Sequence, residues 1–165
     1  MAGACPRAQG RGGHESAGCE HPERPRRGSK VRAVVDASVI VAGLVDSGRE
    51  GRWAEAQLAA GELAGPELAL AEASNVLRRF EAAGALSRLE AATAHRDLLE
   101  VDIALFPFEP FADRVWALRA NLTSYDAWYV ALAEDLDCPL ATLDGRLARA
   151  PGPTCRFAVP PPEPD

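Results

Sequence analysis

The sequence predicts an α/β fold in which a short, mostly parallel sheet is covered by helices on both faces. From about residue 31 to residue 159, short apolar runs alternate with longer stretches whose apolar residues recur at helical spacing. Parallel strands need helical crossovers, so a chain that alternates in this way forms a sheet with helices on either side. At 165 residues, 47% of them hydrophobic, the chain has the length and the apolar content for one domain with its own core.

Five short apolar runs are the predicted strands: 31–35, 63–64, 103–106, 139–143 and 156–159. The first is a β-branched run that ends at Asp36, and the second stops at Gly65-Pro66. The fourth ends directly before Asp144. Short apolar runs of this kind are typical of strands that are buried on both faces.

Six stretches are the predicted helices: 38–45, 52–60, 67–83, 87–100, 110–120 and 124–136. The polar segment 46–51 between the first two is expected to be a loop, and glycines close the second and the third. Ser87 and Glu90 form a capping box at the start of the fourth helix. Pro110 opens the fifth helix and Ser124 caps the sixth.

The domain is placed at residues 31–159, and both ends of the chain are expected to be disordered. Residues 1–30 are rich in Gly, Arg, Pro and Ser, and they cannot bury enough apolar surface to offset the entropy lost on ordering. Residues 160–165 are a Pro-rich tail. The first segment contains four possible zinc ligands, Cys5, His14, Cys19 and His21. Their spacing matches no zinc-binding pattern, and translation starting near residue 31 is an alternative hypothesis for this segment.

The net charge of −6 is unevenly distributed along the chain. Residues 1–32 carry seven of the eighteen basic residues and three of the twenty-four acidic ones, which leaves residues 33–165 with a net charge of −10. Nonspecific affinity for nucleic acids comes from Lys and Arg that neutralise phosphates, so this composition argues against a general polyanion binder. An enzyme acting on nucleic acid is compatible with it if divalent cations neutralise some of the acidic groups.

Neither a membrane span nor a secretory signal is expected. No apolar run approaches the roughly 20 residues of a membrane helix, and the N-terminus lacks the apolar stretch of a signal peptide. The four cysteines show no spacing that suggests a disulfide framework. We therefore expect a cytoplasmic protein in a reducing compartment.

Four acidic residues are candidates for chemistry. Asp36 and Asp144 each follow a predicted strand directly, which is where ligands bind in parallel sheets, although either residue alone is equally well explained as the cap of a turn. Glu72 and Asp126 lie in predicted helices among apolar neighbours. Each of these alone is equally well explained as a surface acid, and Asp126 in a first helical turn is favoured by the helix dipole.

Together, the four acids indicate a metal site. Carboxylates about 4 Å apart in a partly buried setting repel each other by several kcal/mol, so such a cluster persists only when a proton or a cation compensates. Ligands that are all oxygen suit Mg²⁺ or Mn²⁺ rather than zinc. Ions of this kind turn a water into a nucleophile and shield the charge that builds on a phosphate.

Four segments of the sequence carry a resemblance to a known family. Val34-Val-Asp-Ala-Ser-Val-Ile-Val41 resembles the opening strand and acidic turn of PIN-domain proteins, and Glu72-Ala-Ser-Asn-Val-Leu-Arg-Arg79 resembles their second acidic motif. Asn121-Leu-Thr-Ser-Tyr-Asp-Ala-Trp-Tyr-Val-Ala-Leu-Ala133 and Pro139-Leu-Ala-Thr-Leu-Asp-Gly-Arg-Leu147 resemble the third and the fourth. Their order and spacing are those of VapC toxins from bacterial type II toxin–antitoxin pairs, and the resemblance covers about residues 31–159.

The resemblance implies a PIN-like three-layer α/β/α sandwich that hydrolyses RNA with Mg²⁺, or with Mn²⁺. The catalytic and metal-binding quartet of the family falls on Asp36, Glu72, Asp126 and Asp144, with Asp36 and Asp126 as the principal ligands. Glu72 and Asp144 would complete the metal shell and help orient the attacking water. Three further residues are candidates for orienting the ligands: Ser38, Asn75 and Thr142.

The resemblance also implies partners. The substrate would be RNA, and transfer RNA and ribosomal RNA are both plausible. A VapB-type antitoxin would occupy the cleft, and a second copy of the chain would form a homodimer. Arg146 is the best candidate for contact with an RNA phosphate, because it follows Asp144 closely. Arg78, Arg79 and Arg149 are further candidates, and all of these arginines fit helix-surface charges as well.

Two other functions are weighed against the ribonuclease. A phosphatase of the haloacid-dehalogenase type also has an acid after its first strand, but it needs a second Asp two residues on, where this chain has Ser38, and a lysine downstream of Lys30, where there is none. A non-catalytic PIN-like module that binds protein or RNA is the remaining alternative. All four acids are present, so the sequence gives no indication that a catalytic site has been lost. His95 has no accompanying Ser or Cys motif, so a nucleophilic triad has no support.

Overall fold

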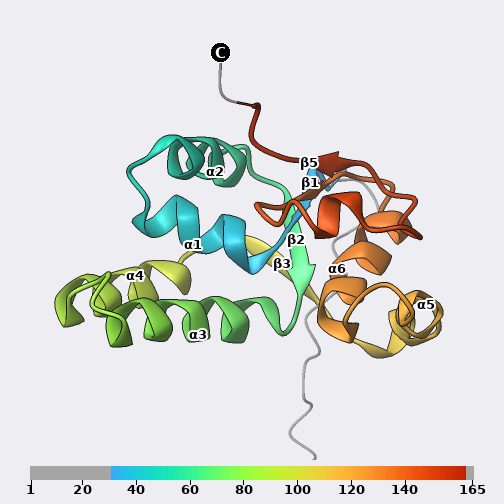
Figure 1. Ribbon diagram of the computed structural model, residues 1–165, viewed down its shortest axis with the longest axis horizontal. Coiled ribbons are helices and arrows are strands. Elements are labelled where there is room, and N and C mark those ends of the chain that lie inside the picture. Colours follow the sequence, from blue (N-terminus) through green and yellow to red (C-terminus); the bar gives the residue numbers. More distant parts are fainter. Residues whose placement is uncertain (1–30, 163–165) are drawn as a thin grey trace, which may run out of the picture.

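A computed structural model describes residues 31–162 of the chain. The segments 1–30 and 163–165, for which disorder is predicted, lie outside the described residues. The described part contains six α-helices, two 3₁₀ helices and one five-stranded sheet, arranged as helix, sheet and helix layers (Figure 1). The predicted α/β sandwich is confirmed.

The sheet is parallel in all four of its described strand pairs. Its order is β3-β2-β1-β4-β5. The strands are β1 (Ala33–Val35), β2 (Leu63–Pro66), β3 (Ile103–Phe106), β4 (Leu140–Ala141) and β5 (Phe157–Ala158). Strands β2 and β3 lie on one side of β1 in the sheet, and β4 and β5 lie on the other side. The strand order therefore reverses between β1 and β4, and such a switch point is where parallel sheets bind ligands.

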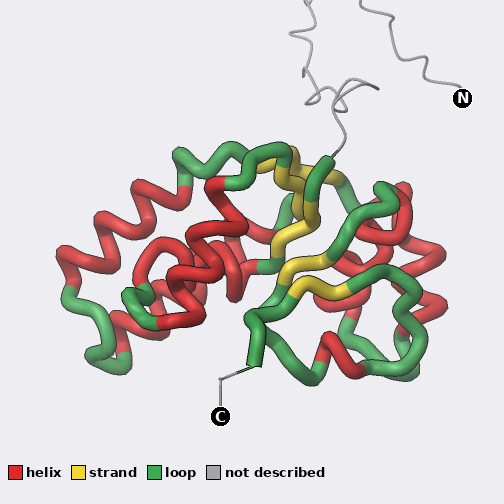
Figure 2. The backbone as a smooth tube through the Cα atoms, turned by 90° about the horizontal axis from the view of Figure 1, so that it is seen from above, coloured by secondary structure: helices red, strands yellow, loops and turns green. Residues whose placement is uncertain are grey.

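The helices form two groups on opposite faces of the sheet (Figures 1 and 2). The first group is α1 (Ala37–Val45), α2 (Arg49–Ala59), α3 (Ala69–Ala82) and α4 (Arg88–Leu98). The second group is α5 (Ala112–Leu118) and α6 (Ser124–Asp135), and the 3₁₀ helices are η1 (Glu109–Phe111) and η2 (Leu147–Arg149). Helix α6 has seven consecutive buried residues, 127–133, because it packs against β1, β2 and β4. Within residues 31–162, no helix combines the length and the apolarity required to cross a bilayer.

Helix α2 begins three residues earlier than predicted, because a side chain organises the corner between α1 and α2. Asp46 ends α1, and its carboxylate accepts hydrogen bonds from the backbone N–H groups of Gly48 (2.7 Å) and Gly51 (2.8 Å). Gly51 is required because it lies close to the backbone of Asp46. A Cβ at this position would lie 1.7 Å from the carbonyl oxygen of Asp46.

Two predicted helix caps have different outcomes. The capping box at the start of α4 is confirmed, since Ser87 N–H donates to the Glu90 carboxylate (2.7 Å) and Glu90 N–H donates to the Ser87 hydroxyl (3.2 Å). At the start of α6 the predicted cap is wrong by one residue. Thr123, in an extended conformation, is the cap, and its hydroxyl accepts from Asp126 N–H (3.2 Å), while Ser124 is already helical.

Candidate active site

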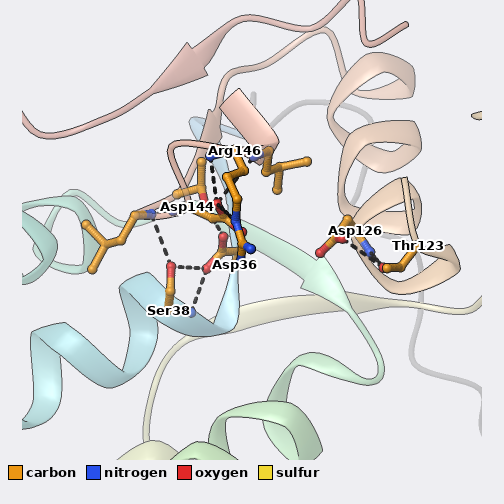
Figure 3. Close-up of polar contacts among 9 residues, drawn as sticks. Asp36, Ser38, Thr123, Asp126, Asp144 and Arg146 are labelled. Atoms are coloured by element: carbon orange, nitrogen blue, oxygen red, sulfur yellow. Dashed lines mark hydrogen bonds and ion pairs between the residues drawn. The ribbon is translucent and has the colours of Figure 1, made fainter. Parts of the chain in front are cut away.

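All four predicted acids line one cavity of about 550 Å³ at the switch point of the sheet. Asp36 follows β1, and Asp144 lies three residues after the end of the adjacent β4. Glu72 comes from the first turn of α3, and Asp126 from the first turn of α6. In Figure 3, Asp36 and Asp144 lie together while Asp126 faces them from α6. Four elements that are distant in the sequence thus each bring one carboxylate to one place.

Asp36 is the most buried of the four, with 7% of its surface exposed. It is the N-terminal cap of α1, and one carboxylate oxygen accepts from Ser38 N–H (2.5 Å), from the Ser38 hydroxyl (2.5 Å) and from Val39 N–H (3.4 Å). The other oxygen accepts a short hydrogen bond from the Thr142 hydroxyl. Burial raises the pKa of Asp36 above its usual value, although these hydrogen bonds oppose the rise.

Two hydroxyl groups connect Asp36 to the segment that carries Asp144. The Ser38 hydroxyl donates to Asp36 and accepts from Leu143 N–H (3.1 Å). The Thr142 hydroxyl donates to Asp36 and accepts from Asp144 N–H (3.0 Å). Because Thr142 is fully buried, this network ties the ends of β1 and β4 to each other and fixes the direction of the Asp36 carboxylate.

Glu72 is held by a residue that the sequence did not single out. The Tyr129 hydroxyl donates to Oε2 of Glu72 at 2.9 Å, and Tyr129 is only 2% exposed. Burial raises the pKa of Glu72, the hydrogen bond from Tyr129 lowers it, and the charges of Asp36 and Asp126 raise it further, with a net rise. Tyr129 lies three residues after Asp126, so the two share a face of α6. This spacing is a signal in the sequence from which Tyr129 could have been predicted as a site residue.

Asp126 and Asp144 are only partly buried. Asp126 Oδ2 accepts from the Thr123 hydroxyl at 2.8 Å. Asp144 Oδ1 accepts from Arg146 N–H (2.7 Å) and Leu147 N–H (3.3 Å), and it lies 3.6 Å from the Arg146 guanidinium. Burial would raise the pKa of Asp144, but these backbone hydrogen bonds and the arginine outweigh it and leave the pKa lowered.

The four carboxylates are poorly neutralised by the protein itself. Within residues 31–162, Arg146 is the one cation that forms an ion pair with any of them, and its side chain is 91% exposed. Glu72, Asp126 and Asp144 each use one oxygen for hydrogen bonds, which leaves the second oxygen of each without a hydrogen-bond partner in this part of the chain. As the side chains stand, no three acidic, His or Cys groups among the described residues are close enough to hold a metal ion together.

One predicted residue lies away from the cavity. Asn75 is exposed and does not contribute to the lining, and its side-chain oxygen accepts two hydrogen bonds from the guanidinium of Arg78, at 3.1 and 2.9 Å. The α3 positions that do line the cavity after Glu72 are Val76 and Phe80, at intervals of four residues. The strip of α3 that carries Asn75 therefore faces solvent rather than the acids.

Comparison with known proteins assigns the chain to a family. The family model of the PIN domain matches residues 33–153, and the chain belongs to this family. Ribonuclease VapC9 of Mycobacterium tuberculosis (strain ATCC 25618 / H37Rv) is 36% identical over 128 residues, which are 78% of this chain and 98% of that protein. Ribonuclease VapC1 of the same strain is 38% identical over 127 residues, 76% of this chain and 96% of that protein. The resemblance to VapC proteins is confirmed.

Solved structures share the fold. The crystal structure of PAE2754 from Pyrobaculum aerophilum matches with a TM-score of 0.60 at 23% identity, covering 79% of this chain and 83% of that chain. The structure of FitAB bound to an IR36 DNA fragment matches with a TM-score of 0.54 at 17% identity, covering 78% and 94%. At these identities the likeness concerns the architecture alone.

Proposed function

We propose that this chain is a divalent-metal-dependent endoribonuclease that acts as the toxin of a toxin–antitoxin pair. The observation that carries the proposal is the gathering of four carboxylates from four separate elements in one cavity. Within residues 31–162 a single, exposed arginine is paired with them. The ribonuclease names of the relatives that match nearly along their whole length support the same reaction.

The donor set fits Mg²⁺, and also Mn²⁺, because it consists of carboxylate oxygens and several of them are not engaged by the protein. Asp36 and Asp126 would be the principal ligands, with Glu72 and Asp144 completing the shell. When bound, the ion would activate a water and shield the charge that develops on the phosphate. Glu72, held through one oxygen by Tyr129, would use its other oxygen to orient the attacking water.

The chemistry is tested with purified full-length protein and total RNA. We expect cleavage with Mg²⁺ or Mn²⁺, none with EDTA, and none in the variant Asp36→Asn, and mapping of the cut ends would distinguish transfer RNA from ribosomal RNA. Ser47→Ala, at an exposed residue that does not line the cavity, is the control and should cleave like the wild type. Full activity of Asp36→Asn, or cleavage that resists EDTA, would contradict the proposal.

The alternative function is a non-catalytic PIN-like module that binds protein or RNA. It predicts that, in the same experiment, RNA stays uncleaved with or without metal and whether or not one of the four acids is replaced. Because all four acids line one cavity, with Asp36 and Glu72 held by specific hydrogen bonds, no observation favours this alternative over the nuclease.

The proposed partner is a VapB-type antitoxin, and the cavity offers a surface that suits one. Beyond the four acids, its lining contains two further carboxylates, Asp46 and Glu50, and an apolar set: Val41, Val45, Val76, Phe80 and Leu86. An amphipathic helix that places apolar side chains on this surface and a basic residue toward the acids would block the site. Co-expression with the neighbouring small open reading frame should relieve growth arrest. A homodimer, expected from the family, is checked by sedimentation of the purified chain.

A further inference from the structure

A second groove adjoins the acidic cavity, and the proposed activity does not yet account for it. It lies between the start of α2, the segment of η2 and the C-terminal residues 157–162, and its volume is about 520 Å³. We call it the η2 groove. Glu50 and Leu143 line both the groove and the acidic cavity, so the two hollows are neighbours with a common wall.

Arg149 gives the η2 groove its charge next to the acids. Its guanidinium lies across Gly145, because a Cβ on Gly145 would be 3.0 Å from Nη1 and 3.4 Å from Nη2 of Arg149. The cation is thereby placed over the residue that directly follows Asp144. Arg149 is exposed, and within residues 31–162 it has neither a hydrogen bond from its side chain nor an ion pair.

Arg49 lines the groove from the other side. It is the first residue of α2, and its Nη2 donates to the carbonyl oxygen of Pro162 at 2.7 Å. This hydrogen bond holds the C-terminal segment in position as a wall of the groove, and Phe157 adds a partly exposed aromatic ring to the lining. Glu50 is the single acidic side chain among the groove's described lining residues.

We propose that the η2 groove binds the RNA strand beside the bond to be cleaved, with Arg149 facing a backbone phosphate. This inference rests on the proposed nuclease function. A strand whose phosphodiester lies at the four acids must leave the cavity, and the lining residues Asp46, Val76 and Phe80 offer a phosphate no donor. Guanidinium groups pair with phosphate oxygens through two parallel hydrogen bonds. The groove therefore supplies, next to the acids, a cation with which a backbone phosphate can pair.

The test measures binding without turnover. In an Asp36→Asn background with Mg²⁺, anisotropy of a labelled single-stranded RNA is followed over a range of salt concentrations for Arg149→Gln, Arg149→Lys and the control Arg88→Gln, an arginine of α4 that lines a separate hollow. Losing one phosphate contact should weaken binding about tenfold and reduce the salt slope by about 0.7. Arg149→Lys should lose less, and Arg88→Gln should bind like its parent.

The outcomes separate this inference from the function on which it rests. The proposed role of the groove would be wrong if Arg149→Gln kept the RNA affinity and the salt slope of its parent, or if Arg88→Gln lost as much affinity. Neither result would bear on cleavage by the wild type. Loss of binding in Arg149→Gln together with no cleavage by the wild type would overturn the nuclease and keep the groove. If a poly-glutamate peptide of the same charge competes as well as unlabelled RNA, the groove is a site for acidic peptides and the inference is wrong.

Discussion

Replacing Tyr129 by phenylalanine removes one oxygen atom from the candidate site and tests how the protein holds Glu72. The Tyr129 hydroxyl donates to Glu72 at 2.9 Å inside a buried environment, and no other hydrogen bond to Glu72's carboxylate exists within residues 31–162. Without the hydroxyl, this carboxylate is free to rotate and loses a donor that favours its ionised form. Both effects oppose the binding of a cation at the four acids.

The size of the effect follows from this one contact. A hydrogen bond to a charged group contributes about 1.5–3 kcal/mol, and about 1.4 kcal/mol corresponds to a factor of ten in an equilibrium constant. Affinity for Mn²⁺ should therefore fall about 10- to 100-fold, the range typical of residues that orient metal ligands. Burial already raises the pKa of Glu72 and the Tyr129 hydrogen bond opposes this rise, so the variant's pKa is higher still. Protons then compete better with the ion, and the deficit grows as the pH is lowered.

The measurement is calorimetric titration of the full-length protein with Mn²⁺ at several pH values. Tyr125→Phe is the matched control, because Tyr125 is the only other tyrosine of the chain, lies on the same helix and is 65% exposed. It should bind Mn²⁺ like the wild type. An affinity of Tyr129→Phe within twofold of the wild type across the pH range would refute the reasoning, and so would an equal loss in Tyr125→Phe.

Two further predictions concern stability. In metal-free buffer, Glu72→Gln should be more stable than the wild type by a margin that grows as the pH rises above 4.5, the ordinary pKa of this group, because burial raises its pKa in the folded state and stability is lost as the carboxyl ionises. Thermal melts with EDTA between pH 4 and 8 measure this difference in stability. A difference that stays constant with pH would show that ionisation of Glu72 is not its cause. Gly51→Ala should lower stability by about 1–3 kcal/mol or more, because its Cβ would lie 1.7 Å from a backbone oxygen that no side-chain rotation can remove. Urea unfolding measures this loss, and a change below about 0.5 kcal/mol would show that the corner between α1 and α2 relaxes freely.

The order of helices and strands could be predicted because it depends on patterns that lie within short stretches of sequence. Buried strands such as β1 read as apolar runs, and the capping box before α4 is a local signal. The ends of the elements depend on contacts that periodicity does not contain. Asp46 closes the turn before α2 with its side chain, so a segment that resembles a loop in composition, residues 46–51, is already helical from Arg49.

The candidate site could be predicted in part, for a related reason. Asp36 directly follows β1 and Asp144 lies in the segment just after β4, and the switch point of the sheet brings such positions together. Tyr129 could not be distinguished from the core, because it lies in a run of seven buried residues and its partner, Glu72, is 57 positions away. Asn75 resembles an orienting residue in the motif, but the turn of α3 directs it to Arg78.

The acidic character of the domain and the proposed RNA substrate can be reconciled by where the charges lie. The acids of the cavity come from the ends of elements and have one paired arginine within residues 31–162, so they repel a phosphate until a cation intervenes. Arg146 and Arg149 follow Asp144 within five residues, and Gly145 lets the second of them lie flat against the backbone. On the proposed mechanism, a metal ion inside the cavity would allow the phosphate to be cleaved to enter only when the ion is present, while the arginines outside the cavity contact the rest of the strand. A domain with a strongly basic surface would bind RNA without that condition, so the negative charge is consistent with selective rather than general binding.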